Sequence, residues 1–380
     1  MKILQISASY KPAYIYGGPT MSVSQLSEQL AKAGINSHVF TTTANGAEEL
    51  SVEAGAVVNV EGVSVTYFSR LTKDHSHFSP SLLLALWKTA LQYDVIHIHA
   101  WWNATSILSC LVAFLRRRPY IISPRGTLSA YSFLNRKKMI KRLIFKCSAP
   151  LLSRGCLHAT ADAERDALIT LLSPLKIFTI PNFVRLSVNQ SPVKQLPGEY
   201  LKLLFFGRIE EKKGLDILFK ALKNLSSSYM LTIAGSGDPA YIAMLKTMAD
   251  EFGIQRNISW AGFQFEHKFE IMAKHDLLIL PSHDENFGNV VIESLSVGTP
   301  VLLTPNVGLS DYIARHCFGW IANLDEDSLA TQLREISPTD PVFIHTHRSA
   351  AAQIKYDFSE AHLRNAYMDM YRELTGKISL

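Results

Sequence analysis

The sequence has few cysteines and none of the spacings that cysteine chemistry requires. Its 380 residues include four, Cys110, Cys147, Cys156 and Cys317, with neither a C-x-x-C pair nor the spacing of a metal site. This excludes a disulfide-stapled extracellular scaffold and a cysteine-ligated zinc centre. We therefore expect four reduced, structural thiols in a cytoplasmic protein.

Long hydrophobic runs are also missing. The longest plain apolar run, residues 104–115, is shorter than the roughly 20 residues that span a bilayer. Residues 1–7 turn polar too soon for a signal peptide. With 47% hydrophobic and 19% charged residues, the chain has the composition of a globular protein large enough for two domains.

Acidic residues are absent from one long stretch. Residues 1–183 carry 19 Lys and Arg against 10 Asp and Glu, whereas residues 184–380 carry 19 against 23. Such asymmetry predicts an anionic partner for the first half, which we expect to be a membrane surface or a glycan and not a nucleic acid. No acid occurs between Asp94 and Asp162, but eleven basic residues do: Arg116, Arg117, Arg118, Arg125, Arg136, Lys137, Lys138, Lys141, Arg142, Lys146 and Arg154.

Two common nucleotide-binding sequences are missing as well. No G-x-G-x-x-G follows the first predicted strand, and no Walker sequence occurs in the chain. Those motifs place glycines and a lysine around the phosphates in dehydrogenases and ATPases. Their absence argues against both classes of enzyme.

What the chain does contain is an alternation of short apolar runs and helical patterns. This alternation predicts an α/β fold, and residues 57–69 predict a hairpin around Glu61 and Gly62. Residues 184–199 lack periodicity and are typical of a linker. We therefore predict two doubly wound, Rossmann-like domains facing across a cleft, residues 1–183 and 184–358. The predicted strands are residues 2–8, 37–42, 95–98, 120–123, 157–160, 176–180, 203–206, 230–234, 258–261, 277–280 and 301–304.

The most informative stretch follows the predicted strand 277–280. Glu285 and Glu293 flank a strand-to-helix turn, with Gly288 and Asn289 between them. Glycine lets a ligand approach the backbone, and the N–H groups of a helix start attract anionic oxygens. The turn therefore suits a nucleotide sugar, with phosphates at the helix start and hydroxyls on the two acids. The alternative is that both acids are solvated and merely favoured near a helix N-terminus.

A second loop follows the predicted strand 203–206. It begins at Gly207 and presents two cations, Arg208 and Lys213. Arginine grips phosphate oxygens with a planar fork, and lysine acts as a point charge. The alternative is a solvated charged loop, but the place at a strand's carboxyl end favours a phosphate site.

The first half offers further candidates at predicted strand ends. Gly17 and Gly18 precede a predicted helix at residues 21–33 and could meet a phosphate there, or form a plain turn. His99 ends strand 95–98, and we favour a site role for it over a core role, whereas His97 is expected in the core. Arg125 follows strand 120–123 and fits a site or a surface position equally.

A basic amphipathic helix is predicted over residues 133–147. Phe133, Ile140, Ile144 and Cys147 form one stripe. Such a helix either lies on a membrane surface or is a solvated helix packed on the sheet. The basic residues assigned to a membrane or acceptor face are Arg136, Lys137, Lys141 and Arg142.

Together these motifs resemble a retaining glycosyltransferase of glycosyltransferase family 4, which has the GT-B fold. The resemblance runs essentially from end to end. One position departs from the family pattern: Phe183 follows Pro181-Asn182 where the family usually has glycine, which puts the hinge geometry in question. The matching motifs are Gly17-Gly18-Pro19, His97-Ile98-His99, Ser123-Pro124-Arg125-Gly126, Ile180-Pro181-Asn182, Phe206-Gly207-Arg208, Lys213-Gly214, Ala234-Gly235-x-Gly237 and Glu285-x7-Glu293.

The resemblance implies roles for these residues. Arg208 and Lys213 would bind the donor diphosphate, Glu293 the ribose hydroxyls, and Glu285 the donor sugar. From the first domain, Gly18 would close on the diphosphate. His99 would contact the sugar near the reacting carbon. The remaining donor contacts are assigned to Gly17, Arg125, Gly207, Phe287, Gly288 and Asn289.

The resemblance also implies the reaction. A sugar would pass from a nucleotide-diphospho-sugar, with UDP or GDP as its nucleotide, to an acceptor hydroxyl with the anomeric configuration retained. No metal or cofactor would be needed, because cations and helix dipoles replace it. We expect a lipid-linked or polysaccharide acceptor at the inner face of the cell membrane, and a C-terminal helix from about residue 359 that packs on the first domain. The alternatives are a nucleotide-sugar epimerase of the same fold and a non-catalytic sugar-nucleotide-binding protein.

Overall fold

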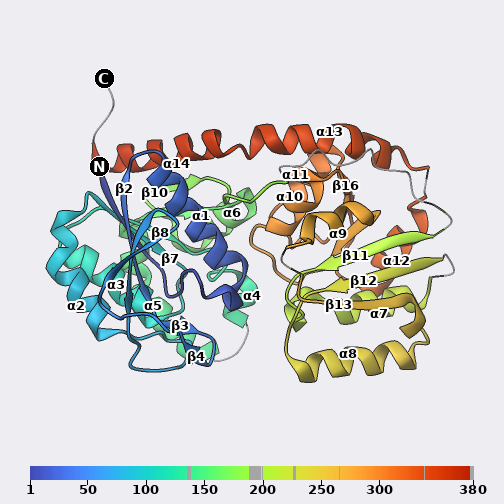
Figure 1. The fold of residues 1–380 in the computed structure, drawn as a ribbon, viewed down its shortest axis with the longest axis horizontal. Coiled ribbons are helices and arrows are strands. Elements are labelled where there is room, and N and C mark those ends of the chain that lie inside the picture. The colour runs from blue at the N-terminus through green and yellow to red at the C-terminus, as the bar shows by residue number, and fades with distance from the viewer. Residues whose placement is uncertain are drawn as a thin grey trace. The chain divides into compact units, whose positions relative to one another are not determined.

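The computed structural model of the chain describes residues 1–134, 138–187, 198, 200–225, 228–264, 266–337 and 339–376. The chain forms two compact units (Figure 1): unit 1 comprises Met1–Phe183 and Glu360–Leu380, and unit 2 comprises Val184–Ser359. Residues 188–197 and 199 of the predicted linker lie outside the described residues.

Unit 1 is built on an eight-stranded sheet with the strand order β10-β9-β8-β7-β1-β2-β6-β5. All neighbours are parallel except β5 and β6, which form the predicted hairpin with Glu61 and Gly62 at positive φ in its turn. A separate antiparallel pair joins β3 (Ala44–Asn45) and β4 (Glu48–Glu49). The strands of the sheet are β1 (Lys2–Ile6), β2 (Asn36–Thr42), β5 (Val57–Val60), β6 (Val63–Phe68), β7 (Val95–His99), β8 (Tyr120–Ser123), β9 (Cys156–Ala159) and β10 (Lys176–Thr179).

Helices cover both faces of this sheet. Because side chains alternate along a strand, Leu4 and Ile98 point into a core shared with α2, α3, α5 and α6. Gln5 and His97 point the other way, where α14 packs against β7 and α1. The helical segments are η1 (Tyr14–Tyr16), α1 (Gly18–Lys32), α2 (Pro80–Thr89), η2 (Ala90–Gln92), α3 (Ala104–Leu115), α4 (Ala130–Leu134), α5 (Lys138–Arg154), α6 (Asp162–Leu172) and α14 (Glu360–Thr375).

The predicted helix over residues 133–147 coincides with the end of α4 and the start of α5, and its residues 135–137 lie outside the described residues. Phe133 supports the alternative of a packed helix over that of a helix on a membrane surface. Its ring packs edge-to-face against the rings of Trp102 and Phe145, with centroids 5.1 Å away in both cases. An aromatic cluster of this kind is more stable inside the unit than against solvent.

Unit 2 contains a six-stranded parallel sheet with the order β13-β12-β11-β14-β15-β16. Its strands are β11 (Leu201–Phe206), β12 (Tyr229–Ala234), β13 (Ile258–Gly262), β14 (Leu277–Leu280), β15 (Val301–Leu303) and β16 (Gly319–Ile321). Its helical segments are η3 (Glu211–Lys213), α7 (Leu215–Lys223), α8 (Pro239–Glu251), η4 (Gln255–Asn257), α9 (Lys268–Lys274), α10 (Asn289–Ser296), α11 (Ser310–His316), α12 (Glu326–Glu335) and α13 (Pro341–Asp357). Two doubly wound sheets, parallel except for the β5–β6 pair and flanked by helices, confirm the predicted fold class.

Each sheet has a point where the strand order reverses. In unit 1, β1 lies between β2, which follows it in the chain, and β7. In unit 2, β11 lies between β12 and β14. In open α/β sheets, ligands bind beyond the carboxyl ends of the strands at such a point. The loops after β1 and β7, and those after β11 and β14, are therefore where a site is expected.

Candidate functional site

Unit 2 brings the predicted phosphate-binding loop and the predicted acidic loop together. The first follows β11 and the second follows β14, which are neighbours at the reversal of the sheet. Gly214 has φ +67°, and a Cβ there would lie 2.1 Å from the carbonyl oxygen of Pro281. Only glycine allows so close an approach of two backbones, so Gly214 fixes the distance between the loops.

The central contact between the loops is an ion pair. Lys213 Nζ contacts Glu285 Oε2, and the two side chains are 13% and 22% exposed. Burial alone would raise the pKa of Glu285, but attraction to Lys213, then Lys212 and Arg208, outweighs it and lowers that pKa. Glu285 is therefore held as a carboxylate beside a cluster of cations. Arg208 is 54% exposed and lies 3.3 Å from Glu210, so its guanidinium remains accessible to a ligand.

The backbone around Glu285 is held in place by a short parallel bridge. Its N–H donates to Asn306 O at 3.0 Å, and its carbonyl accepts from Gly308 N at 2.8 Å. This bridge joins the loop after β14 to the loop after β15. The Glu285 side chain therefore projects from a fixed backbone and not from a free loop.

Glu293 lies inside α10 and has a cationic partner of its own. Lys268, the first residue of α9, pairs with it, and their side chains are 16% and 14% exposed. Burial raises the pKa of Glu293, and Lys268 only partly opposes that rise. The two acids therefore differ in environment, since the pKa of Glu285 is lowered and that of Glu293 is raised.

The turn between the acids is shaped for a backbone contact. Gly288, at φ +92°, precedes α10, whose first residue is Asn289, and no side-chain cap covers that helix start within the described part of the chain. Phe287 is 2% exposed and its ring lies 6.1 Å from that of Phe358, so only its backbone can face a ligand. Gly207 opens the other loop at φ +157°, which is close to extended backbone.

In unit 1, the two glycines begin α1 three residues earlier than predicted. Gly17 has φ 65° and precedes the helix, Gly18 is its first residue and Pro19 lies in its first turn. Proline suits that place because its missing N–H costs no hydrogen bond there. No side-chain cap from the described residues covers this helix start.

His99 and Arg125 meet at the carboxyl ends of β7 and β8. Arg125 Nε donates to His99 Nδ1 at 3.3 Å, and its Nη1 donates to Asn182 Oδ1. His99 is 1% exposed, and its Nε2 lies 2.7 Å from Gln5 Oε1. Burial, the rings of His97 and His158, and the charge of Arg125 lower the pKa of His99. His99 is therefore a neutral imidazole with both ring nitrogens engaged, and His97 is fully buried as predicted.

The residues assigned to a membrane or acceptor face have different surroundings. Arg136 and Lys137 lie outside the described residues. Lys141 does not belong to an open basic face, because its Nζ donates to Ser132 O at 2.6 Å and lies 5.7 Å from the centroid of the Trp102 ring. Arg142 is exposed on α5. No helix in the described ranges is long and apolar enough to cross a membrane.

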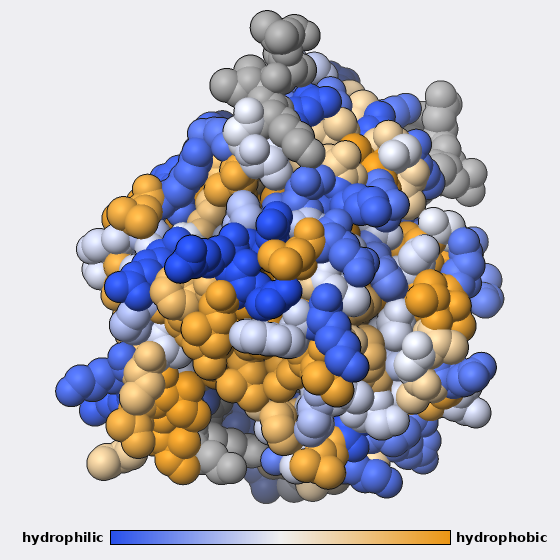
Figure 2. All heavy atoms as spheres, turned by 90° about the vertical axis from the view of Figure 1, so that its left-hand side faces the viewer, coloured by the Kyte–Doolittle hydropathy of each residue, from blue (hydrophilic) through white to orange (hydrophobic). Residues whose placement is uncertain are grey.

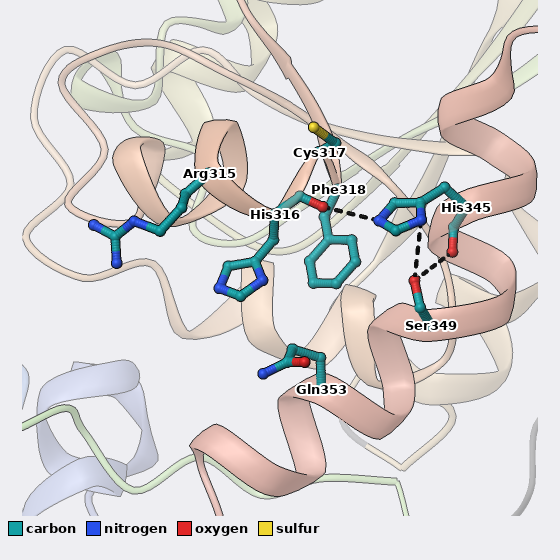
Figure 3. Close-up of a pocket in the computed structure, with 7 residues that line it drawn as sticks. All are labelled: Arg315, His316, Cys317, Phe318, His345, Ser349 and Gln353. Carbon is teal, nitrogen blue, oxygen red and sulfur yellow. Dashed lines mark hydrogen bonds between the residues drawn. The ribbon is translucent and has the colours of Figure 1, made fainter.

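A cavity of about 460 Å³ lies elsewhere in unit 2 (Figure 3). The ring of Phe318 stacks between those of His316 and His345, with both centroid distances 5.4 Å. The lining comes from the end of α11, the turn after it and α13, and includes none of the predicted donor residues. The lining residues are Arg315, His316, Cys317, Phe318, His345, Ser349 and Gln353.

The cysteines and the potential metal ligands among the described residues do not gather into a cluster. Cys110 and Cys156 are buried thiols, and Cys147 and Cys317 are exposed ones. Among the described residues, no three His, Cys, Asp or Glu side chains gather in a metal-binding arrangement.

Several site residues were not predicted from the sequence. Lys268 is one lysine in a polar loop, and nothing local marks it as the partner of Glu293. Gln5 could have been identified from the sequence, since it is a polar residue inside an apolar strand. Tyr371, whose hydroxyl lies 2.7 Å from His97 Nδ1 and accepts from Gln5, could not, because a tyrosine on an amphipathic helix is an ordinary core residue.

Comparison with known proteins identifies the family. Residues 16–188 match the model described as "Glycosyltransferase Family 4", and residues 188–341 match "Glycosyl transferases group 1". The chain belongs to the GT4-type glycosyltransferases, and its two doubly wound sheets form the GT-B fold. It is 26% identical over 387 residues to the D-inositol 3-phosphate glycosyltransferase of Mycolicibacterium smegmatis, an alignment that covers 93% of this chain and 86% of that protein.

Solved structures of low sequence identity share the fold. The sucrose-phosphate synthase of Thermosynechococcus elongatus has a TM-score of 0.78 at 18% identity, covering 99% of this chain and 100% of that one. Anabaena HepE in complex with UDP and glucose has a TM-score of 0.74 at 20% identity, covering 98% and 100%. WaaG, a glycosyltransferase involved in lipopolysaccharide biosynthesis, has a TM-score of 0.68 at 17% identity, covering 98% and 100%.

Proposed function

We propose that this glycosyltransferase moves a hexose from a nucleotide-diphospho-sugar to an acceptor hydroxyl with the anomeric configuration retained. One observation carries the proposal: two cations and two acids with oppositely shifted pKa values lie near the point where the strand order of the unit 2 sheet reverses. A diphosphate needs cations, and a ribose and a sugar need hydrogen-bond acceptors. Arg208, Lys213 and Glu285 lie in two adjoining loops, and Glu293 lies in α10, the helix that follows the second loop.

Each unit 2 residue has a proposed role. Arg208 and Lys213 neutralise the diphosphate, and the start of α10 at Gly288 and Asn289 adds its N–H groups. Glu293, held by Lys268, accepts hydrogen bonds from the ribose. Glu285, together with the backbone of Phe287, accepts hydrogen bonds from the donor sugar. Lys213 then has two functions, since it faces the phosphate and also keeps Glu285 ionised.

The roles in unit 1 follow from the family resemblance and remain predictions. Gly17 and Gly18 present the start of α1 to the diphosphate. His99 and Arg125 face the sugar near the reacting carbon. Because His99 is neutral and already bonded to Arg125, the two act as one positioned group.

The proposed reaction is a front-side displacement. The bond from the anomeric carbon to the β-phosphate oxygen breaks, and the acceptor oxygen forms a new bond to that carbon from the same face. The acceptor proton passes to the leaving phosphate, so no protein base is required. Arg208 and Lys213 stabilise the charge that develops on the leaving group.

Nuclear magnetic resonance of the first product formed tests this reaction. We expect an α-linked donor to give an α-linked product, with initial rates unchanged in excess EDTA because cations of the protein replace a metal at the diphosphate. A β-linked first product would contradict the retaining mechanism. Loss of activity in EDTA that returns with Mg²⁺ would contradict metal independence. Donor isomerisation without an acceptor would instead identify the epimerase alternative.

The donor and acceptor classes are also proposals. The HepE structures contain UDP with glucose or UDP-glucose, which favours a UDP-sugar here, with a GDP-sugar as the next choice. WaaG is described as taking part in lipopolysaccharide biosynthesis, and another relative is a protein of a cps region in Klebsiella pneumoniae. We therefore propose a lipid-linked or polysaccharide glycan as the acceptor, at the inner face of the cell membrane.

An exposed apolar face supports the membrane part of this proposal. We define the α2–α3–α5 face by nine large apolar side chains that are 37–83% exposed and lie on α2, η2, α3 and α5, helices that pack side by side. Figure 2 views the side of unit 1 where α2 lies in Figure 1, and hydrophobic surface gathers there between hydrophilic residues. The nine are Leu84, Trp87, Leu91, Leu111, Leu115, Met139, Ile140, Leu143 and Ile144.

Basic side chains lie on or directly after the same helices. Arg116 lies 5.1 Å from the centroid of the Trp87 ring, and Arg154 lies 5.5 Å from that of Phe114. Arg117, Arg142 and Lys146 are exposed. An apolar face with cations and no acid on its helices fits an anionic bilayer, which attracts each nearby cation by about 1 kcal/mol.

Flotation with phospholipid vesicles tests the membrane proposal. We expect the protein to float with vesicles of phosphatidylcholine and phosphatidylglycerol at low salt, to be released at high salt, and to ignore pure phosphatidylcholine, because exposed charges are screened. The triple change Arg117→Glu, Arg142→Glu and Lys146→Glu should abolish flotation and leave donor hydrolysis unchanged.

The matched control reverses three exposed lysines of unit 2, Lys246, Lys274 and Lys355, and should float like the wild type. If the wild type never floats, or if both triple variants behave alike, the α2–α3–α5 face does not bind anionic membranes. In that case an anionic polysaccharide would be the next ligand to titrate.

A further inference from the structure

Three buried histidines in unit 1 belong to one chain of hydrogen bonds. His158 Nε2 lies 2.9 Å from Ile180 O, and His158 Nδ1 lies 2.6 Å from Ser123 Oγ. Ser123 Oγ lies 2.6 Å from His97 Nε2, and His97 Nδ1 lies 2.7 Å from the hydroxyl of Tyr371. Gln5 Nε2 donates to that hydroxyl at 3.0 Å, and Gln5 Oε1 lies 2.7 Å from His99 Nε2.

The partners at the two ends of this series of hydrogen bonds determine which atom donates in each bond. At one end, Ile180 O can only accept, so His158 carries its proton on Nε2 and accepts from Ser123. Ser123 must then accept from His97 Nε2, which leaves His97 Nδ1 to accept from Tyr371. At the other end, Arg125 Nε can only donate to His99 Nδ1, so His99 also carries its proton on Nε2.

Every donor in this chain therefore meets an acceptor. A second proton on any of the three rings would face another donor: Arg125 at His99, Tyr371 at His97, or Ser123 at His158. The three imidazoles are at most 1% exposed, so no water can take the extra proton's bond. The arrangement allows one tautomer of each ring.

Tyr371 is the link that comes from elsewhere in the sequence. Gln5 lies on β1, His97 and His99 on β7, Ser123 on β8 and His158 on β9, whereas Tyr371 lies on α14, 274 residues from His97. Its hydroxyl accepts from β1 and donates to β7, which are the two strands at the reversal of the sheet. Its side chain is fully buried.

We infer that Tyr371 is a positioning residue for His99, because its hydroxyl holds the amide of Gln5 and, through that amide, the orientation of the His99 ring. Arg125 determines the tautomer of His99 with or without this hydroxyl. Without the hydroxyl, Gln5 Nε2 and His97 Nδ1 each lose a partner. The Gln5 amide loses the bond that holds its Nε2, so it can shift and weaken its bond to His99 Nε2. The catalytic part of this inference rests on the proposed role of His99.

The charged and titratable groups around this series of hydrogen bonds favour the neutral form of the three histidine rings. Arg125 faces His99, Tyr367 of α14 faces His158, and Glu164 of α6 accepts from Gly126 N next to Arg125. Burial lowers the pKa of all three histidines, and neighbouring histidines or Arg125 lower it further, to about 3 for His158. The rings therefore stay neutral well below pH 6.5.

Long-range ¹H–¹⁵N spectra of the histidine rings test the inference without relying on activity. In the wild type, we expect His97, His99 and His158 to appear as neutral rings protonated on Nε2 at pH 6. A protonated Nδ1 on His97 or His99, or a charged ring, would overturn the inference. This measurement needs no variant, so it stands even if a substitution prevents folding.

The Tyr371→Phe variant tests the link itself. We expect changed ¹H and ¹⁵N shifts of the His99 ring, with its tautomer retained, and a fall in transfer kcat of about tenfold, with affinity for the nucleoside diphosphate unchanged. Tyr93→Phe is the matched control, because the buried Tyr93 hydroxyl also bonds a histidine, His38 Nδ1 at 2.9 Å, away from this chain. It should change neither the His99 spectrum nor kcat.

The outcomes separate this inference from the proposed function. Unchanged His99 ring shifts in Tyr371→Phe overturn the inference, whatever the activity. Changed shifts with unchanged kcat overturn the catalytic role of His99 and leave only a structural one for Tyr371, which also contradicts the inference. Correct wild-type tautomers in a protein that turns over no sugar nucleotide would contradict the proposed function alone.

Discussion

Replacing Arg208 by alanine is expected to lower donor turnover about a hundredfold while unit 2 stays folded. The Arg208 side chain is 54% exposed and lies 3.3 Å from Glu210, so its loss disturbs little of the folded structure of the free protein. With a donor bound, the same group is proposed to hold a diphosphate that gains charge as the sugar leaves. A charge-assisted contact of about 3 kcal/mol corresponds to about a hundredfold in rate. Steady-state release of nucleoside diphosphate measures the effect.

Replacing Lys213 by alanine should cost as much turnover and also some stability. Its removal leaves the largely buried Glu285 without its partner, which is expected to cost about 1–3 kcal/mol of unfolding free energy. Thermal unfolding of the two variants therefore distinguishes them. Lys220→Ala, at the far end of α7, is the control and should leave turnover unchanged. Near-normal turnover in both Arg208→Ala and Lys213→Ala would show that these two cations do not bind the leaving diphosphate.

Replacing Glu293 by glutamine should weaken the binding of the free nucleoside diphosphate about tenfold or more, whereas replacing Glu285 should leave that affinity nearly unchanged. The reason is that a ribose is present in the nucleotide alone and the donor sugar is not. Glu285→Gln should instead lower turnover by tenfold or more and weaken discrimination between donor sugars. A lost bond to a charged acceptor of about 1.5–3 kcal/mol gives effects of this size. Titration calorimetry and steady-state kinetics measure the two quantities.

The pH dependence should separate the acids in the same way. Because the pKa of Glu293 is raised and that of Glu285 is lowered, acidification protonates Glu293 first. A protonated Glu293 accepts hydrogen bonds less well, so nucleotide affinity should fall as the pH drops while Glu285 is still ionised. The fall should be absent in Glu293→Gln and present in Glu251→Gln, an exposed control on α8. Equal losses of nucleotide affinity in Glu285→Gln and Glu293→Gln would show that the roles are assigned wrongly.

The sequence predicted the two loops of the proposed donor site because local chemistry marks them. Buried strands followed by Gly207 and Pro281 are recognisable from apolar runs, and parallel strands bring their carboxyl ends to one edge of a sheet. Arg208, Lys213 and Glu285 occupy those ends, so their neighbourhood could be predicted without coordinates.

The partners of these residues could not be predicted, because they depend on contacts between distant segments. Lys268 precedes Glu293 by 25 residues and pairs with it only because α9 packs beside α10. Tyr371 reaches Gln5 across 366 residues. The surroundings of the α5 side chains could not be predicted for a related reason: charge pattern alone cannot show that Lys141 bonds to Ser132 O while Met139 and Leu143 remain exposed.

Release of nucleoside diphosphate from a panel of UDP-, GDP- and ADP-sugars tests directly whether the loops after β11 and β14 bind a nucleotide sugar. We expect that one nucleotide class is consumed, that release is about a hundredfold slower in Arg208→Ala, and that Lys220→Ala matches the wild type. No release from any donor, or equal rates in the wild type and Arg208→Ala, would contradict a nucleotide-sugar donor site at the loops after β11 and β14.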